Sequence, residues 1–413
     1  MGSGWNRFPI VAAAAAAVVL AVSACGGSGS GSAGSASTGG AATTRASGSV
    51  TLASWSSSPE EEALLRKVIA AFEKSHPQIK VNYNVINGDY PTAMTARFSA
   101  HNPPDVFYVD SSVAPGWAQQ GVLEPLDSYI SASGYDTSAF YPNLLHGFQQ
   151  GGKTYGLPKD WSPLGMEINT SMLSAAGQQA PTTWQQLESV ARALAAKNAV
   201  PGGKPICLSA DWARMLAFVE QNGGSLQNVT SPKVARAVSF YVGLIKDGLA
   251  QTPDKLGSGW CGEALGKQKA AIIFEGNWLL PFMSSTYPKV SYRVFPMVKA
   301  VRRGNLAFTV SYSMAKDSKN KPAAWALLSW LTSKQGQALW VSKGLALPSR
   351  RDVRPVGAGK PFLAEAPAAQ PWGFPNFSQA YSAMNNDLAA VISGGKSVQA
   401  MLQDVSGKLS QGS

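Results

Sequence analysis

Val106-Phe107-Tyr108-Val109 is a continuous apolar run, and Asp110 follows it directly. A run of this kind is typical of a parallel strand that is buried on both faces of a sheet. Two strand patterns precede it, at 50–55 and 79–85, and apolar residues at helical spacing fill the stretches between them. The order strand, helix, strand, helix, strand predicts an α/β fold with a parallel sheet.

The same alternation recurs after residue 160. Strand-like runs at 206–208 and 271–274 alternate with helical patterns that begin at Trp184 and Lys233. Further helical patterns cover 323–331, 377–392 and 398–409. A chain of 413 residues is long enough for two lobes with separate hydrophobic cores, so we expect two α/β lobes.

The amino-terminal segment has the features of a secretion signal. An apolar run from Ile10 to Val22 follows a short region that carries only Arg7, and it is too short to span a bilayer well. Val22-Ser23-Ala24-Cys25 looks like a bacterial lipobox, in which the cysteine is acylated and becomes the new amino terminus. We therefore expect a signal peptide at 1–24, and a lipidated Cys25 with a flexible Gly/Ser linker at 25–49. The alternative is an ordinary signal peptide that contains a cysteine.

Composition excludes several classes of function. The net charge is +11, but only 14% of the residues are charged, and apart from Arg302-Arg303 and 350–354 the basic residues are scattered. A nucleic-acid-binding protein would interleave such charges with aromatic residues on one face. We expect instead a solvated basic surface, suited to an anionic membrane or cell wall, and no nucleic-acid partner.

The cysteine count predicts one disulfide. With Cys25 assigned to lipid, Cys207 and Cys261 remain in a compartment that permits disulfides. A bridge between them closes a loop of more than 50 residues and would stabilise the fold by roughly 3–4 kcal/mol. The alternative is a pair of buried free thiols.

The sequence lacks the usual signatures of catalysis. The three histidines are dispersed and there is no Cys-x-x-Cys, so no metal site is expected. Neither a Gly-x-Ser-x-Gly elbow nor a phosphate-binding glycine loop is present. We expect no catalytic residue, no cofactor and no enzymatic activity.

Seven motifs occur in a characteristic order: Phe72–Val81, Asn102–Phe107, Gly121–Asp127, Tyr155–Asp160, Ile168-Asn169, Pro181–Trp184 and Phe274–Trp278. Together they resemble the extracellular solute-binding proteins of ABC importers, specifically the sugar-binding family that includes maltose-binding protein. The resemblance covers about residues 50–410.

The resemblance implies a two-lobed periplasmic-binding-protein fold of type II, with the ligand in a cleft between hinged lobes. One lobe would comprise 50–158 and 311–352, the other 163–308 and 355–410, and Tyr155–Asp160 would be a crossing strand of the hinge. It also implies a permease and an ATPase as partners. We expect a monomer, anchored by lipid to the outer face of the cell membrane.

A carbohydrate site needs aromatic platforms and side chains that donate and accept hydrogen bonds. Trp278 follows a buried strand and a glycine, and it matches the family position whose Trp stacks on a sugar ring; alternatively it packs against its own lobe. Trp55 ends the strand at 50–55 and Asp110 follows the strand at 106–109, so both lie at the edge that faces the cleft; alternatively Trp55 is a packed aromatic of the rim.

Other candidates depend more on the resemblance. Trp212 stands where the family places another stacking aromatic; alternatively, Asp211 before it caps the helix that follows. Asp160 at the hinge accepts from sugar hydroxyls or, alternatively, forms a salt bridge with Lys159 or another cation. The remaining candidates are residues at a family position near the cleft, a residue after the second hinge crossing and a residue in a Pro/Gly/Phe-rich loop: Asp89, Tyr90, Tyr312 and Trp372.

These features favour a receptor that binds a mono- to oligosaccharide for an ABC importer. The same fold also binds other polar solutes, such as a glycerophosphodiester or a polyamine, and these remain alternatives. A ferric-ion binder is disfavoured because the chain has no adjacent Tyr-Tyr pair. A secreted glycosidase with two carboxylates is a third alternative.

Overall fold

A computed structural model describes residues 46–56, 59–374 and 376–410 of the chain. The predicted signal peptide, Cys25 and most of the predicted linker lie outside these residues. The end of that linker was predicted wrongly, because Gly48 and Ser49 pair with Ile79 and Lys80 as part of a strand. Within the described ranges, no helix has the length and apolar character needed to cross a membrane.

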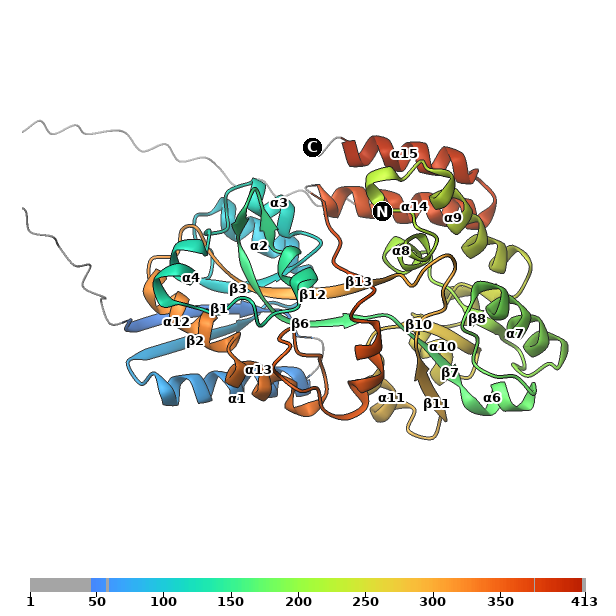
Figure 1. The fold of residues 1–413 in the computed structure, drawn as a ribbon, viewed down its shortest axis with the longest axis horizontal. Coiled ribbons are helices and arrows are strands. Elements are labelled where there is room, and N and C mark those ends of the chain that lie inside the picture. Colours follow the sequence, from blue (N-terminus) through green and yellow to red (C-terminus); the bar gives the residue numbers. More distant parts are fainter. Residues whose placement is uncertain (1–45, 57–58, 375, 411–413) are drawn as a thin grey trace, which may run out of the picture. The chain divides into compact units, whose positions relative to one another are not determined.

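The first sheet contains a parallel core with an antiparallel extension (Figure 1). Strands β2, β1 and β3 are parallel, as the sequence predicts, but β12 runs antiparallel to β3, and β6 runs antiparallel to β12. The predicted parallel arrangement of the first three strands is therefore confirmed, and the antiparallel strands β12 and β6 extend the sheet beyond it. The strands of this sheet, in spatial order, are β13 (Ala369–Gln370), β12 (Asn305–Met314), β3 (Val106–Asp110), β1 (Gly48–Ser54) and β2 (Ile79–Val85), with β6 (Gly156–Pro163) also paired to β12.

The second sheet is also mixed. Strands β10, β8 and β9 are parallel, whereas β7 is antiparallel to β10 and β11 is antiparallel to β7. Its strands, in spatial order, are β11 (Tyr292–Phe295), β7 (Gly165–Asn169), β10 (Ala270–Glu275), β8 (Lys204–Cys207) and β9 (Ala250–Gln251). A separate short hairpin is formed by β4 (Gln149–Gln150) and β5 (Lys153–Thr154).

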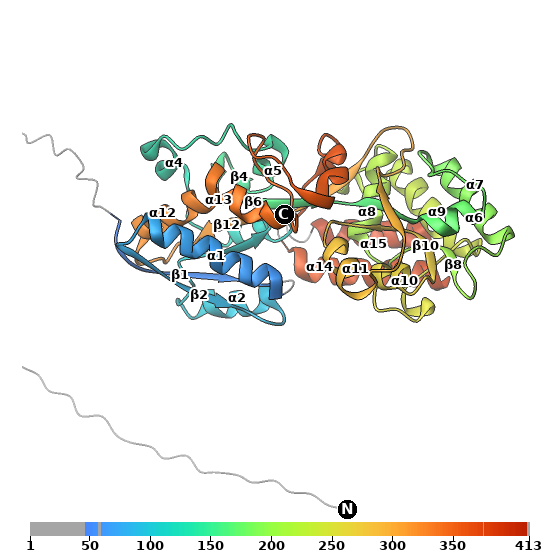
Figure 2. The same ribbon diagram turned by 90° about the horizontal axis from the view of Figure 1, so that it is seen from below.

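Each sheet has its own hydrophobic core. Leu52, Phe72 and Leu328 belong to the core of the first sheet, and Ile206 and Leu388 to that of the second. Figure 2 shows α1 lying across β1 and β2. The helices between the strands of the first sheet, with those that follow β12, are α1 (Pro59–Ser75), α2 (Tyr90–Ser99), α3 (Ala114–Gln119), α4 (Asp127–Ser133), α5 (Pro142–His146), α12 (Lys321–Leu331), α13 (Lys334–Trp340) and η3 (Val341–Lys343).

The helices that accompany the second sheet include every long helix predicted after residue 180 except the one at 323–331. Two antiparallel helices, α14 and α15, end the described chain and pack against α8 and α9. These helices are α6 (Thr170–Ala175), α7 (Trp184–Ala196), α8 (Trp212–Gln221), η1 (Leu226–Asn228), α9 (Pro232–Lys246), η2 (Asp254–Leu256), α10 (Cys261–Gly266), α11 (Leu279–Thr286), η4 (Gly357–Glu365), α14 (Phe377–Ser393) and α15 (Val398–Ser410).

Two paired strands connect the cores. Within β6 and just after it, Leu157 packs in the first core and Leu164 in the second; within β12, Leu306 packs in the second core and Tyr312 in the first. Figure 1 shows β6 and β12 running together between the two sheets. The lobe boundaries that the family resemblance implies stay a prediction.

Candidate functional site

An aromatic cluster stands at the carboxyl ends of β1 and β3. The half-buried Trp55 contacts Tyr90 and Tyr108 edge to face, with ring centroids 4.9 and 5.1 Å apart. Tyr312 on β12 contacts Tyr108 at 5.3 Å. The Tyr90 hydroxyl donates to the carbonyl of Tyr108 at 3.1 Å. Tyr90 and Tyr312 are buried, so they support Trp55 and do not present a ring face to solvent as the prediction required.

A buried ion pair lies beside this cluster. A bulge in the pairing of β6 with β12 leaves Lys159 out of register, and such bulges redirect side chains. The Lys159 ammonium bonds to Asp160 Oδ2 and lies 4.7 Å from the Tyr108 ring and 4.3 Å from the Trp340 ring. Trp340 Nε1 donates to the same carboxylate oxygen at 2.8 Å. The salt bridge with Lys159, which was one of the two interpretations of Asp160, is therefore present.

Asp110 lies in the same row of residues as Asp160. The register pairs Val310 of β12 with Asp110 on one side and with Asp160 on the other, so both carboxylates project from the same face of the sheet. Asp110 accepts from the amide of Ser112 at 2.8 Å and from its hydroxyl at 2.5 Å. Burial raises the pKa of Asp110, and the charge of Asp160 raises it further.

Asp89 has a structural partner of its own. Its carboxylate caps α2 by accepting from the amide of Thr92 at 3.3 Å and from the Thr92 hydroxyl at 2.6 Å. A capping aspartate satisfies a helix amide that would otherwise lack a partner. A role in binding for the exposed Asp89 stays a prediction.

A second cluster stands at the corresponding edge of the second sheet; we call it the Arg214 cluster, formed by Arg214, Asp211, Glu275 and Tyr381. The Arg214 guanidinium makes a bidentate contact with the Glu275 carboxylate, with Nε–Oε1 at 3.2 Å and Nη2–Oε2 at 2.6 Å. Its Nη1 donates to Asp211 Oδ2 at 2.5 Å. Asp211 Oδ1 accepts from the Ala213 amide at 2.7 Å and from the Tyr381 hydroxyl, so this residue both caps α8 and joins the cluster.

The cluster links two predicted platforms. Trp278, just beyond β10, donates from Nε1 to Glu275 Oε2 at 3.1 Å, and the Arg214 guanidinium lies 5.8 Å from its ring centre. Trp372 contacts Tyr381 edge to face at 5.3 Å. Both indoles are half-buried. Trp278 also packs edge to face against Phe308 at 5.2 Å, so the alternative interpretation, packing within its own half of the protein, describes part of its surroundings.

The prediction for Trp212 requires correction. Its side chain is fully buried within the core of the second sheet, although it directly follows Asp211. The first turn of α8 rotates Asp211 toward Arg214 and Tyr381 and Trp212 toward the core. Trp212 is therefore a core residue in this structure and offers no ring face to a ligand.

Glu167 on β7 adds a buried carboxyl behind the cluster. Its Oε2 accepts from the amide of Glu275 at 3.0 Å, and its Oε1 has no hydrogen-bond partner among the described residues. Burial and the neighbouring Glu275 raise the pKa of Glu167 well above its usual range. Burial also raises the pKa of Glu275, against the opposing effect of Arg214.

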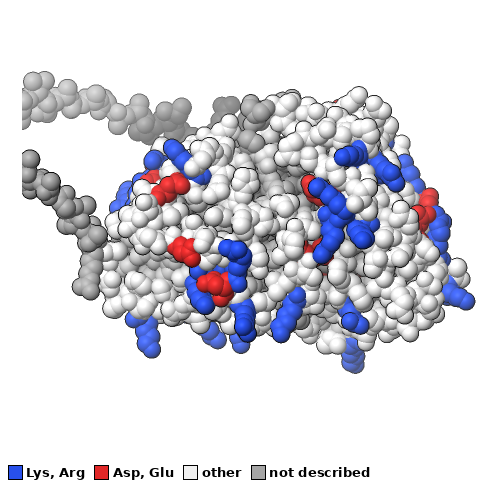
Figure 3. Space-filling view, in the orientation of Figure 1, with Lys and Arg blue, Asp and Glu red and all other residues white. Residues whose placement is uncertain are grey.

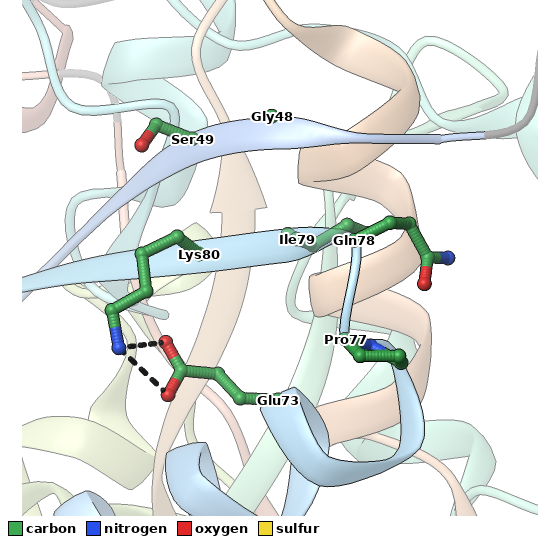
Figure 4. Close-up of a pocket in the computed structure, with 7 residues that line it drawn as sticks. All are labelled: Gly48, Ser49, Glu73, Pro77, Gln78, Ile79 and Lys80. Carbon is green, nitrogen blue, oxygen red and sulfur yellow. Dashed lines mark hydrogen bonds and ion pairs between the residues drawn. The ribbon is translucent and has the colours of Figure 1, made fainter.

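The described residues form two pockets, one apart from both clusters and one beside Trp372. Figure 4 shows one at the amino-terminal ends of β1 and β2, beside the 3.0 Å ion pair of Glu73 and Lys80. Ligands of open α/β sheets bind at the opposite, carboxyl ends. The other is a cavity of about 860 Å³ lined by residues of both halves, among them Ser111, Leu216 and the predicted platform Trp372.

The surface charge agrees with the scattered basic residues of the sequence. Figure 3 shows Lys and Arg side chains spread over the visible face, with fewer Asp and Glu among them. Over the ranges that the structure describes, no group of three His, Cys, Asp or Glu side chains is arranged to hold a metal ion.

Sequence reasoning missed Arg214 and Tyr381 as site residues, and it used Glu275 only as part of a motif. A signal for Arg214 existed, because Asp211 and Arg214 are three residues apart at the start of a predicted helix and therefore share a face. Tyr381 carried no such signal, since it reaches Asp211 from a helix 170 residues later.

The two mixed sheets with separate cores, the two connecting strands and a cluster of aromatic and charged residues at the edge of each sheet form a two-lobed α/β protein. Residues 55–338 match the family of bacterial extracellular solute-binding proteins, and the chain belongs to this family. The predicted family resemblance is thus confirmed. The solute-binding part of the chain accordingly functions outside the cytoplasm.

Individual relatives agree with this assignment. A multiple sugar-binding protein of Streptococcus mutans is 24% identical over 296 residues, which are 63% of this chain and 67% of that protein. The ABC substrate-binding protein of Listeria monocytogenes in complex with cycloalternan has a TM-score of 0.78 and 21% identity, over 88% of this chain and 98% of its own. UgpB of Mycobacterium tuberculosis in complex with glycerophosphocholine has a TM-score of 0.77 and 17% identity, with the same coverage. The solved structures confirm the predicted two-lobed α/β fold.

Proposed function

We propose that this protein captures a carbohydrate between its two lobes and delivers it unchanged to an ABC permease and its ATPase. The observation that carries the proposal is the pair of half-buried indoles, Trp55 and Trp278, which lie just beyond the carboxyl ends of β1 and β10, strands of two different sheets. A tryptophan face suits the apolar C–H face of a sugar ring.

Polar groups beside both indoles suit the hydroxyl groups of a sugar. Asp110 and Asp160 lie on one side, and the Arg214 cluster on the other. Carboxylates accept from hydroxyls, and the remaining N–H groups of a guanidinium donate to them. The multiple sugar-binding protein of Streptococcus mutans and the cycloalternan complex support the same ligand class.

The proposal includes attachment to the membrane. Cys25, in the lipobox-like segment, would carry the lipid, and the Gly/Ser-rich residues after it would supply reach. A lipid on the new amino terminus would hold the receptor at the outer face of the membrane, where the permease lies.

A glycerophosphodiester is the second candidate ligand, because UgpB in complex with glycerophosphocholine has the same fold. The two ligand classes make different demands. A phosphodiester needs an uncompensated cation, whereas Lys159 and Arg214 are both paired with carboxylates. This pairing favours the carbohydrate.

A thermal-shift panel tests the proposal, since a ligand that binds only the folded state raises the melting temperature. The mature chain is screened against mono-, di- and trisaccharides and glycerophosphocholine, and hits are quantified by calorimetry. We expect a carbohydrate to give the largest shift and to be recovered intact after overnight incubation. A shift with glycerophosphocholine alone would favour the second candidate, and hydrolysis of a sugar would contradict a binding function.

A further inference from the structure

The Arg214 cluster is an anion-binding group that is already occupied by the protein's own carboxylates. Arg214 makes three hydrogen bonds to Glu275 and Asp211, and Glu275 is fully buried while a fifth of the Arg214 and Asp211 side chains is exposed. A bidentate fork is the geometry with which arginine also binds phosphate and sulfate. Glu275 therefore takes up the two donors of Arg214 with which the guanidinium could otherwise hold an anion.

The net charge of the Arg214 cluster also disfavours an anionic ligand. One guanidinium faces two carboxylates, so the cluster carries a net negative charge when both are ionised. The buried cation of the other cluster, Lys159, is likewise paired with Asp160 and held over two aromatic rings. Asp110 adds a further carboxylate that accepts from Ser112 and makes no ion pair among the described residues.

We propose that Arg214, Asp211 and Glu275 determine ligand specificity, so that the site accepts uncharged polyhydroxyl solutes and rejects anionic ones such as sugar phosphates. This inference rests on the proposed function. An anion would meet net negative charge and would have to displace Glu275 from Arg214. An uncharged sugar is not repelled by this negative charge and does not have to displace Glu275. It bonds to the exposed parts of Arg214 and Asp211 and leaves the contact between Arg214 and Glu275 intact.

The carboxylates of the two clusters are equally unsuited to binding a cationic ligand. Those of the cluster already have their cation in Arg214, and Asp160 has its own in Lys159. Asp110 and the buried Glu167 behind the Arg214 cluster make no ion pair within the described ranges, and each instead accepts a backbone amide. A polyamine needs carboxylates for several ammonium groups, so spermidine is a suitable cationic probe.

Calorimetry on the mature chain tests the inference with three probes: the uncharged sugar that gives the largest thermal shift, glucose 1-phosphate and spermidine. Glu275→Gln keeps the shape of the side chain but removes the charge opposite Arg214. Asp211→Asn does the same at the more exposed partner, and serves if Glu275→Gln fails to fold. Glu263→Gln is the matched control, since Glu263 pairs with Lys267 on α10 outside the cluster.

We expect wild type to prefer the uncharged sugar. In Glu275→Gln and Asp211→Asn, the ratio of glucose 1-phosphate affinity to sugar affinity should rise at least tenfold, while Glu263→Gln keeps the wild-type ratio. Tight binding of glucose 1-phosphate or spermidine to wild type would overturn the inference. So would an unchanged ratio in both folded cluster variants.

Different results would contradict the proposed function and the inference about ligand specificity. If wild type binds no sugar, the proposed function is wrong, and the affinity for glucose 1-phosphate alone then tests the inference. A gain of at least tenfold in either cluster variant would support it, and no gain in both would overturn it. If wild type binds sugar but the variants show no change in selectivity, the proposed function stands and the role of the cluster is refuted.

Discussion

At Trp278, the indole ring and the indole N–H have different partners. The N–H donates to Glu275, which fixes the ring, while the half-buried face remains partly accessible. Trp278→Ala should weaken binding of the panel sugar by at least about 2 kcal/mol, or roughly 30-fold, as for a buried aromatic anchor. Calorimetry measures the loss.

Trp325→Ala is the control for that substitution. Trp325 is also half-buried, but it packs against Tyr129 and Tyr135 beside the first core, away from both clusters. Its loss should lower thermal stability and leave affinity unchanged. Equal affinities in wild type and a folded Trp278→Ala variant would remove Trp278 from the site.

Glu167 should make stability depend on pH. Its pKa is raised in the folded state, so the folded protein holds a proton that the unfolded chain releases above its ordinary value of about 4.3. The contribution of Glu167 to the free energy of unfolding is therefore greatest at low pH and falls as the pH rises toward the folded-state pKa. Glu167→Gln removes this fall and retains an acceptor for the amide of Glu275.

Urea denaturation at pH 5 and pH 7 measures the effect. The stability of Glu167→Gln relative to wild type should improve from pH 5 to pH 7, by up to about 1.4 kcal/mol per pH unit. Glu263→Gln serves as the control, because the pKa of Glu263 is lowered by its bond to Lys267. The same pH dependence in wild type and Glu167→Gln would show that this carboxyl ionises normally.

Among the elements, β8 and α10 are joined covalently. Cys207 at the end of β8 and Cys261 at the start of α10 form a disulfide across 54 residues, and both lie in a small apolar cluster with Leu265 and Ile273. Replacing both cysteines by serine should cost about 3–4 kcal/mol of unfolding free energy. Denaturation with and without a phosphine reductant tests this: reductant should destabilise wild type but not the double variant. Insensitivity of wild type to full reduction would contradict it.

Local sequence patterns predicted the long amphipathic helices and several buried strands, but not strands such as β7 and β12, nor how all of the strands pair. Buried runs such as 106–109 and 271–274 fix a strand through local composition alone. The direction of β12 relative to β3 depends on contacts between residues some 200 positions apart, and an apolar run has no polarity that would reveal it. The same limit hid the approach of Tyr381 to Asp211.

For the predicted site residues, the sequence did not show which side chains at a strand end point outward. Strand ends are visible in the sequence, so Trp55, Asp110 and Trp278 could be proposed as site residues from it, and the structure places them at strand ends. Which neighbour at such an end points outward depends on the first helical turn, and this detail separates Asp211 from Trp212. Ion pairs such as Arg214 with Glu275 join distant segments and appear only once the fold is known.

For the whole molecule, membrane attachment should depend on Cys25. If the thiol is acylated, wild type will fractionate with membranes, and Cys25→Ala will be released into the medium or left unprocessed. Immunoblotting of fractions, with the mass of each species, distinguishes these results. A Cys25→Ala protein that stays on the membrane at the wild-type mass would refute the lipobox interpretation.

Ligand binding should also draw the two lobes together. A ligand shifts a conformational equilibrium only when it makes better contacts in one state than in the other. A sugar held between Trp55 and Trp278 touches both lobes only when they are close, and β6 and β12 are the paired strands about which they would move. Small-angle X-ray scattering of the mature chain should give a smaller radius of gyration with saturating panel sugar than with a sugar that does not bind. An unchanged radius at saturation would mean that the ligand contacts one lobe alone, and recognition by the permease could not then depend on closure.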